Sequence, residues 1–427
     1  MRRGMTSSAG TGVMLLVVLS WLFSSCSTTP KPIEEPPPVE VGQQSVYCQW
    51  HKRPLSETRA DSLSFPWLPK DPRTRVGWID TLSHHYDAVA FGYDHWDLET
   101  WSWLIEQFHQ RGVKVGIYTP TINVYEWSWK AYLRGRWEPG SYHYEWNHRL
   151  APHFARTTEL DPATAEPDTF ATWFRAYNGD YSDECVAAFV SLCVDFLSDW
   201  DWLMLDWCSI QLYDLKKWQP QAYSDTEYGE LDFDQNGVPH SEDTEERLWW
   251  IGQQIKMVEQ LDQALPEMLL VPNGNLAAYW PEFAVWVNGC YVERAPNQLN
   301  SPYSRKSWKQ VLDPEYERSL FKLTEPGYFQ EPFMILLEDR LNESRYPDRS
   351  FSFIAALFDG VYHLVRVNPD CWKVTHPPDL GLGSAEKKCW KVDNTLSRVY
   401  TGGEVWVDIQ ADSRFTGGVW RPTDNRR

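Results

Sequence analysis

The chain has 427 residues, enough for one large domain or two ordinary ones, and it carries a formal net charge of −19. Hydrophobic residues make up 42% and charged residues 23%, which is typical of a globular protein whose core needs neither metal nor disulfides for stability. No Lys/Arg cluster provides the basic face that binds phosphates, so the composition excludes nucleic acid as a partner.

The N-terminus has the pattern of a targeting segment. The apolar run Met14–Phe23 follows two arginines and is too short to span a bilayer. The next residues, Phe23-Ser24-Ser25-Cys26, resemble a bacterial lipobox in which Phe replaces the usual Leu. We therefore predict a lipoprotein signal peptide at 1–26, with lipidation of Cys26, and a Pro/Glu-rich tether at 27–44. The protein would then be lipid-anchored in the bacterial cell envelope, periplasmic or surface-exposed. An ordinary cleaved signal peptide is the alternative.

Short apolar runs alternate with helical patterns from Ser45 onward. Runs without polar alternation are typical of parallel strands that are buried on both faces. The predicted strands are Val46–Trp50, Ala88–Phe91, Val113–Tyr118, Trp202–Asp206, Leu269–Pro272, Cys290–Glu293, Phe333–Leu337 and Gly360–Val365. The predicted helices are Leu98–Gln110, Cys185–Leu197, Glu245–Leu265, Ser304–Leu323 and Arg349–Phe358. This order predicts an α/β fold, a (β/α)8 TIM barrel over 45–368. A doubly wound sheet is less favoured because no Gly-x-Gly-x-x-Gly follows the first strand.

Two long segments interrupt the alternation, Thr121–Asp183 after the third strand and Gln211–Asp243 after the fourth. Both fall after strands, on the face where barrels place their active-site loops. Beyond the barrel, Arg398–Val407 contains a Gly pair flanked by β-forming residues, which predicts a hairpin. We therefore expect 369–427 to be a small β-rich extension.

The chain is rich in aromatic residues, with 25 Trp. One interpretation is that they fill the interface between helices and sheet. The other is that indole rings stack on sugar rings around a cleft, and we favour it for a group in polar, turn-rich sequence. That group is Trp127, Trp129, Trp137 and Trp146.

The cysteines show no Cys-x-x-Cys pair and no Cys/His spacing of a zinc site. Cys371 and Cys389 flank a Pro-rich loop and are a candidate disulfide in an oxidising compartment. The cysteines in apolar segments are expected to be buried thiols: Cys185, Cys193, Cys208 and Cys290.

Two predicted strands end in a carboxylate, Asp206 on the fourth and Glu293 on the sixth. In a barrel both positions face the same cleft, and glycoside hydrolysis needs two carboxylates that flank the scissile bond. We therefore predict a glycoside hydrolase of the retaining type, acting on an unidentified poly- or oligosaccharide, with Asp206 as nucleophile and Glu293 as acid/base. Salt bridges, for example between Glu293 and Arg294, are the structural alternative. The alternative function is a non-catalytic glycan-binding surface lipoprotein.

Other polar residues follow the predicted strands and are candidates for binding sugar hydroxyls. For Asn273, ordinary turn chemistry of an Asn-Gly pair is an equally simple explanation. The candidates are Asp94, His95, Asn123, Trp207, Asn273, Arg294 and Glu338.

The acidic segment contains the spacing of a calcium loop. Asp232, Asp234 and Asn236 occupy positions one, three and five, Gly237 position six and Asp243 position twelve. Alternating oxygen ligands allow a loop to wrap Ca²⁺, so we predict a structural calcium ion and no cofactor for catalysis. A solvated acidic turn is the alternative.

Several motifs resemble those of hypothetical glycoside-hydrolase-like barrel families that are distantly similar to endo-α-1,4-polygalactosaminidases. The motifs are Asp201-Trp-Leu-Met-Leu-Asp206, Val271-Pro-Asn273-Gly274, Asn288-Gly289-Cys-Tyr-Val-Glu293, Asp379-Leu-Gly381-Leu-Gly383 and Arg398–Val407. Trp202 stands where those families have Gly, and Asn288 stands in place of Asp. The resemblance implies a retaining-type barrel with acids after strands four and six, and it implies no particular substrate.

Overall fold

The structure is a computed structural model. It describes residues 45–49, 73, 76–92, 97–154, 169–171, 175–206, 208, 232–234, 236–238, 242–274, 276–292, 311–315, 319–340, 349–366, 380–382, 384–408 and 416–420. Chain contacts divide the protein into Met1–Glu40 and Val41–Arg427, and every described residue belongs to the second unit. Among these residues, no helix combines the length and apolar character needed to cross a membrane.

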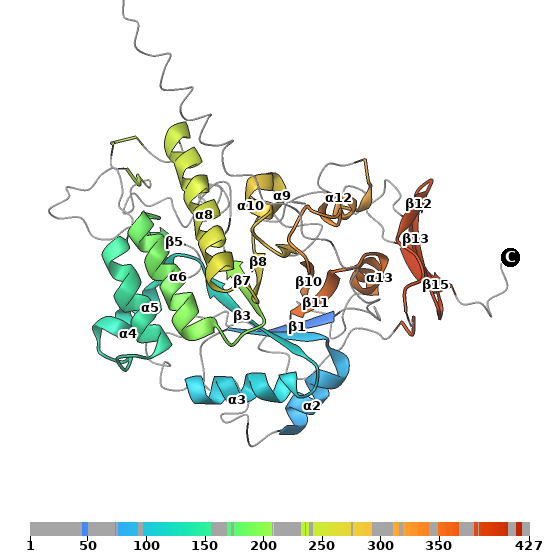
Figure 1. Ribbon diagram of the computed structural model, residues 1–427, viewed down its shortest axis with the longest axis horizontal. Coiled ribbons are helices and arrows are strands. Elements are labelled where there is room, and N and C mark those ends of the chain that lie inside the picture. Colours follow the sequence, from blue (N-terminus) through green and yellow to red (C-terminus); the bar gives the residue numbers. More distant parts are fainter. Residues whose placement is uncertain are drawn as a thin grey trace, which may run out of the picture. The chain divides into compact units, whose positions relative to one another are not determined.

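All eight predicted strands are present in one parallel sheet, with ends within three residues of the prediction. The strands are β1 (Ser45–Gln49), β2 (Ala88–Gly92), β3 (Lys114–Pro120), β7 (Trp202–Asp206), β8 (Leu269–Pro272), β9 (Gly289–Val292), β10 (Met334–Arg340) and β11 (Val361–Arg366) (Figure 1). Their order is β8-β7-β3-β2-β1-β11-β10-β9. The predicted α/β class with a parallel sheet is therefore confirmed.

The two end strands of this order, β8 and β9, also contact each other. Asn273 and Tyr291 form a parallel bridge. Asn288 forms two further links, because its backbone N–H donates to the Leu270 carbonyl at 2.8 Å and its Oδ1 accepts the Leu270 N–H at 2.9 Å. The side chain of Asn288 thus acts as an extra sheet partner where β9 begins.

Helices connect successive strands of the sheet. Aspartate and serine side chains cap several of them: Asp97 accepts the Thr100 N–H, Ser182 the Cys185 N–H and Asp243 the Glu246 N–H. The helices are α2 (Val76–His85), α3 (Leu98–His109), α6 (Asp183–Leu197), α8 (Thr244–Ala264), α9 (Leu276–Tyr279), α10 (Pro281–Ala284), α12 (Leu320–Leu323) and α13 (Arg349–Leu357).

The predicted helix Ser304–Leu323 is not continuous. A turn occupies 314–315, and α12 begins only at Leu320, whereas 301–310 and 316–318 lie outside the described residues. The interruption has a local cause, because Pro314 lacks an N–H and disfavours helical backbone at Asp313. Asp313 instead accepts the Glu315 N–H in a turn.

The insertion after β3 has secondary structure of its own that the sequence did not predict. It comprises β4 (Asn123–Tyr125), α4 (Glu126–Leu133), α5 (Tyr142–Leu150), η3 (Ala151–His153), β5 (Thr169–Ala171) and β6 (Arg175–Asn178). Its strands form an antiparallel sheet in the order β4-β6-β5. Trp146 is buried there and its indole N–H donates to the Asn123 carbonyl, so the prediction of an exposed sugar-stacking role was wrong for this residue.

The C-terminal residues form the predicted hairpin within a four-stranded antiparallel sheet. Its strands are β12 (Trp390–Val392), β13 (Thr395–Tyr400), β14 (Gly403–Asp408) and β15 (Thr416–Trp420). This sheet packs on α13: the Tyr400 hydroxyl donates to the Ala356 carbonyl, and Arg398 forms an ion pair with Asp359.

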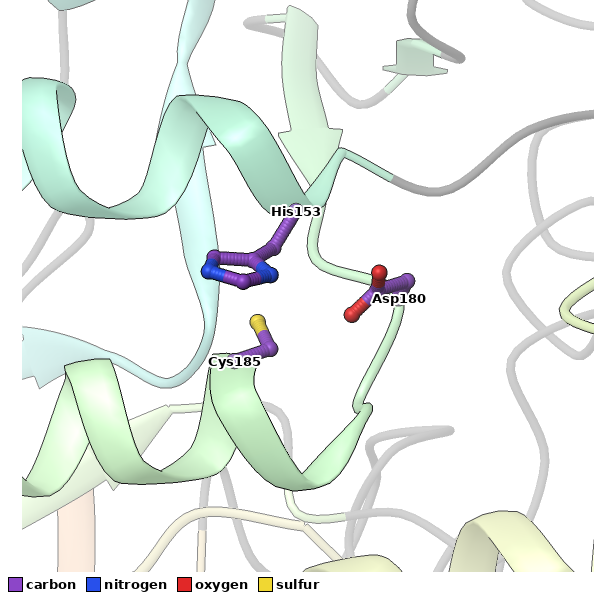
Figure 2. A group of neighbouring side chains, drawn as sticks. All are labelled: His153, Asp180 and Cys185. Atoms are coloured by element: carbon purple, nitrogen blue, oxygen red, sulfur yellow. The ribbon is translucent and has the colours of Figure 1, made fainter.

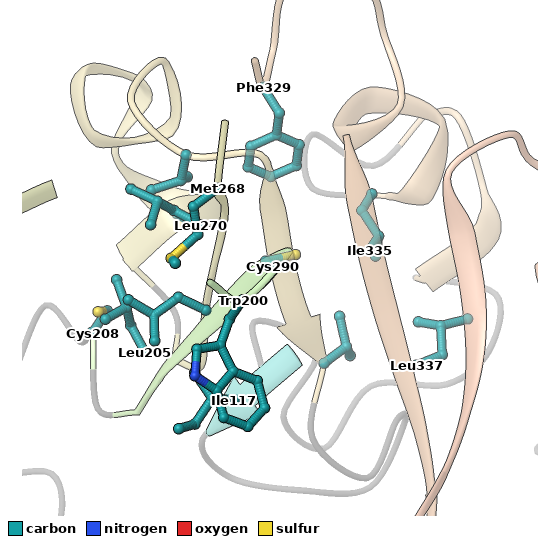
Figure 3. Packing of buried hydrophobic residues seen from close by; sticks show 14 of the residues in the cluster. Ile117, Trp200, Leu205, Cys208, Met268, Leu270, Cys290, Phe329, Ile335 and Leu337 are labelled. Carbon is teal, nitrogen blue, oxygen red and sulfur yellow. The ribbon is translucent and has the colours of Figure 1, made fainter. Parts of the chain in front are cut away.

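Buried apolar side chains gather on both faces of the parallel sheet. The larger cluster lies between strands and helices, and Figure 3 shows part of it, including Ile117 of β3, Leu205 of β7 and Ile335 of β10. A smaller cluster takes the alternate residues of the strands: Ala88, Ala90, Trp202, Met204, Val271, Tyr291, Met334, Leu336 and Leu364.

Trp202 of the smaller cluster has a specific partner on the neighbouring strand. A Cβ atom on Gly116 of β3 would lie 1.9 Å from the Trp202 ring, so only glycine leaves room for the indole. The bulky residue on β7 and the missing side chain on β3 are therefore complementary.

The cysteine predictions are confirmed for the four apolar positions, all of which are buried free thiols. Burial raises the pKa of the Cys290 thiol to about 12. Cys389 is a free thiol as well, and Cys371 lies outside the described residues.

Candidate functional site

Asp206 is a buried carboxylate at the end of β7, with 3% of its surface exposed. It shares the strand face of Trp202 and Met204, which belong to the smaller cluster. Two donors point at its oxygens: the Tyr118 hydroxyl donates to Oδ2, and the Asn273 amide donates to Oδ1 at 2.7 Å. Hydrogen bonds to a carboxylate stabilise its negative charge, so these donors offset part of the cost of burial.

The Asn273-Gly274 turn brings that amide to Asp206. Asn273 follows β8, and its backbone N–H donates to the Leu205 carbonyl at 2.6 Å. Gly274 has φ 134°, and a Cβ atom there would lie 2.2 Å from the Cys208 carbonyl oxygen. Asn273 therefore forms a turn and also contacts the candidate nucleophile, and its predicted binding of sugar hydroxyls stays a prediction.

Tyr118 is the member of this group that the sequence did not reveal. It lies on β3, where Tyr118 pairs with Met204 and Pro120 pairs with Asp206. In the sequence, Tyr118 ends an apolar strand run, and nothing in that pattern distinguishes it as a site residue from the core residues beside it. Only the pairing of β3 with β7 brings its hydroxyl to the carboxylate.

Glu338 and Asp339 of β10 lie on opposite faces of the sheet. Glu338 is fully buried and is two residues beyond Leu336, a member of the smaller cluster. Asp339 instead forms a buried chain with His363 and Ser352, in which the imidazole contacts the carboxylate at 3.1 Å and the serine hydroxyl at 2.9 Å. Ser352 is fully buried in α13, and the chain lies on the sheet face opposite that of Asp206, so it does not present a nucleophile at the Asp206 site.

Cys208 follows Asp206 closely and is fully buried. Burial first, and the Asp206 carboxylate second, raise the pKa of its thiol far above the ordinary range. A protonated, buried thiol is a poor nucleophile, so Asp206 is the better candidate for a reactive group at this strand end.

Asn123 lies on β4 in the insertion, where it is buried and its amide is 3.5 Å from the Thr121 hydroxyl. Its role in sugar binding stays a prediction. Several predicted site residues lie outside the described residues, including Glu293, whose separation from Asp206 would distinguish retaining from inverting chemistry. The others are Cys26, Asp94, His95, Trp207 and Arg294.

The acidic loop brings three carboxylates together. One oxygen each of Asp232, Asp234 and Glu246 lie within 4.8 Å of one another. Asp232 accepts the Asn236 and Gly237 N–H groups at 3.2 and 2.9 Å, and burial is the largest of the effects that raise its pKa.

The third carboxylate differs from the one in the predicted ligand set. Asp243 caps α8, and its other oxygen accepts the Asn236 amide at 2.9 Å. Glu246, one turn later, accepts the Phe233 and Asp234 N–H groups at 2.7 and 3.1 Å. The sequence spacing selected Asp243 at position twelve, whereas the carboxylate that converges with Asp232 and Asp234 is Glu246 in the first turn of the following helix.

No protein-family model and no curated protein match the chain. Among solved structures, it is similar to the glycoside hydrolase domain of PelA from Pseudomonas aeruginosa, with 14% identity, a TM-score of 0.41 and coverage of 78% of this chain and 99% of that one. It is also similar to Eubacterium rectale Amy13B (10%, 0.46, 88% of each chain). A further similar structure is a Geobacillus stearothermophilus GH36 α-galactosidase, AgaA, in complex with stachyose (9%, 0.44, 90% of this chain and 53% of that one). Likeness of this degree assigns neither a family nor an activity to the chain.

Proposed function

We propose that the protein is a glycoside hydrolase in which Asp206 is the nucleophile. The observation that carries the proposal is the environment of Asp206: a buried carboxylate at the end of a parallel strand, with the Tyr118 hydroxyl and the Asn273 amide directed at its oxygens. A carboxylate held in one orientation and stabilised as an anion suits attack on an anomeric carbon.

The proposal includes closure of the parallel sheet into a (β/α)8 barrel. It is supported by the bridge between Asn273 and Tyr291 and by the two hydrogen bonds of Asn288 to Leu270, which join the ends of the strand order. The smaller cluster supports it too, because side chains from β2, β7 and β10 pack together although these strands are not neighbours. Active sites of such barrels lie at the carboxyl ends of the strands, where Asp206 is found.

The second carboxylate in this proposal is Glu293, the acid/base. It comes two residues after Tyr291, a member of the smaller cluster, and strand alternation predicts the same side for both. Glu338 on β10 is assigned to substrate binding. The resemblance to barrel families related to endo-α-1,4-polygalactosaminidases agrees with these roles and stays part of the proposal.

A polysaccharide panel tests the function. The full chain should release new reducing ends from at least one α- or β-linked polymer, and Asp206→Asn should release none. Binding of a polymer without cleavage by the wild-type chain would instead support the alternative, a non-catalytic glycan-binding surface lipoprotein.

We further propose that the acidic loop holds a structural Ca²⁺, because hard carboxylate oxygens converge there. Calcium at 100 times its Kd would stabilise the fold by about 2.7 kcal/mol. We expect calcium to raise the Tm of the wild-type chain and the double variant Asp232→Asn/Asp234→Asn to lose this response. Differential scanning calorimetry with and without chelator measures it.

Glu267→Gln serves as the control. Glu267 is exposed and follows the C-terminal end of α8, so this variant removes a carboxylate away from the acidic loop. If the wild type and the double variant showed the same change in Tm with calcium, the loop would be a solvated acidic turn that holds no calcium ion.

Anchoring through Cys26 is also proposed. A lipid on this thiol would be the apolar tether that remains after signal removal. Cys26→Ala should therefore move the protein from the membrane fraction to the soluble fraction of its host, as followed by immunoblotting. Continued sedimentation of the variant with membranes would contradict lipidation.

A further inference from the structure

Three side chains with metal-ligating atoms converge outside the Asp206 site. They are His153 at the end of η3, Asp180 in the turn before α6, and Cys185 in the first turn of α6 (Figure 2). One potential ligand atom of each residue lies within 4.8 Å of the other two. The imidazole of His153 has no hydrogen-bond partner among the described residues, so its nitrogens remain available.

The backbone fixes these three residues relative to one another. The Asp180 N–H donates to the His153 carbonyl at 2.6 Å, and Phe154 forms an antiparallel β-bridge with Gly179. A Cβ atom on Gly179 would lie 2.1 Å from the Ile122 side chain and 2.9 Å from Cys185 Sγ, so glycine permits this close approach. Tyr181, buried and with φ 53°, completes the turn that directs the Asp180 carboxylate toward the helix.

Side-chain hydrogen bonds orient the two ligands nearest α6. Ser182 donates its hydroxyl to Asp180 Oδ1 at 2.7 Å and accepts the Cys185 N–H at 3.2 Å. Cys185 thus lies in the first turn of α6, with its backbone N–H held by the Ser182 hydroxyl. Its sulfur is buried, whereas His153 and Asp180 are half-buried, which leaves one side of the cluster open to water.

The donor set has the chemistry of a transition-metal site. Imidazole nitrogen, carboxylate oxygen and thiolate sulfur together suit Zn²⁺, which binds them at about 2.0–2.3 Å in tetrahedral geometry. Ligand atoms in such a tetrahedron are roughly 3–4 Å apart, so small side-chain rotations would close the present arrangement around an ion. Ca²⁺ and Mg²⁺ prefer oxygen ligands and are disfavoured by the thiol.

We propose that His153, Asp180 and Cys185 bind one Zn²⁺ ion, with water as the fourth ligand. The ion links η3 and the turn after β6, both in the insertion that follows β3, to α6, which leads into the strand carrying Asp206. It is separate from the acidic loop in both residues and ligand chemistry.

Cobalt substitution tests the site in the full chain. After chelator treatment, Co²⁺ is titrated in the presence of millimolar Ca²⁺, which occupies any oxygen-only site. We expect one equivalent of Co²⁺ to produce a thiolate-to-cobalt charge-transfer band, and one equivalent of Zn²⁺ to remove it. Cys185→Ser should abolish the band and weaken zinc binding by about 100-fold or more.

Cys193→Ser is the matched control, because Cys193 is an equally buried thiol on the same helix and lies outside the cluster. This variant should keep both the band and the zinc affinity. His153→Gln, at a half-buried position outside the core, tests the site if Cys185→Ser fails to fold, and it should lower the zinc affinity without changing the circular dichroism spectrum. A wild-type chain without the band, or a band that survives in the folded Cys185 or His153 variant with full affinity, would overturn the proposal.

Discussion

Asp206→Asn is expected to lower kcat on any polysaccharide substrate by at least about 10³-fold. The amide keeps the shape of the side chain but removes the charge that attacks the anomeric carbon, so no glycosyl-enzyme forms. Steady-state kinetics and intact-protein mass spectrometry of trapped intermediates measure both effects. Circular dichroism and Tm establish that the fold is retained, because a destabilised strand would also abolish activity.

Tyr118→Phe is the matched control for this prediction. It removes one donor to Asp206 while the carboxylate remains. A hydrogen bond to a charged group contributes about 1.5–3 kcal/mol, so the loss should be about 10- to 100-fold, well below that of Asp206→Asn. A folded Asp206→Asn enzyme with wild-type activity would remove this residue from the reaction.

The second large effect is expected at Glu293. Glu293→Gln removes the proton donor and leaves Asp206 intact, so activity on natural linkages should fall by about 10²- to 10⁴-fold. Substrates with good leaving groups need little protonation and should be far less affected. Azide should restore part of the lost rate by attacking the glycosyl-enzyme. Release of activated aryl glycosides with and without azide measures the asymmetry.

Glu338→Gln distinguishes the proposed role of Glu338 in substrate binding from the proposed acid/base role of Glu293. If Glu338 binds substrate hydroxyls, its variant should raise KM on all substrates alike and gain nothing from azide. If azide rescued Glu338→Gln and left Glu293→Gln unchanged, the acid/base would have to be reassigned to β10. Equal, unrescued losses in both folded variants would contradict the proposed roles altogether.

The sequence determined the positions of the eight strands, because each buried parallel strand is a continuous apolar run whose limits depend on local composition. It also determined the hairpin between β13 and β14, since the Gly pair at 402–403 marks the turn. Asp206 was recognisable for a similar reason, because a charged residue at the end of an apolar run is visible in the amino-acid sequence without knowledge of the fold. The helix predicted at Ser304–Leu323 is interrupted because Pro314 disfavours helical backbone at Asp313, an effect that outweighs the apolar pattern of the segment.

Only the tertiary structure decided which side chains meet. Tyr118 reaches Asp206 because β3 pairs with β7, and Trp202 fits because Gly116 lies opposite it. The convergence of His153, Asp180 and Cys185 depends on the turn at Tyr181 and on the bridge between Phe154 and Gly179. Propensity and hydrophobic periodicity are properties of neighbouring residues, whereas a site is made by contacts between residues distant in sequence, which form only when strands pair and helices pack.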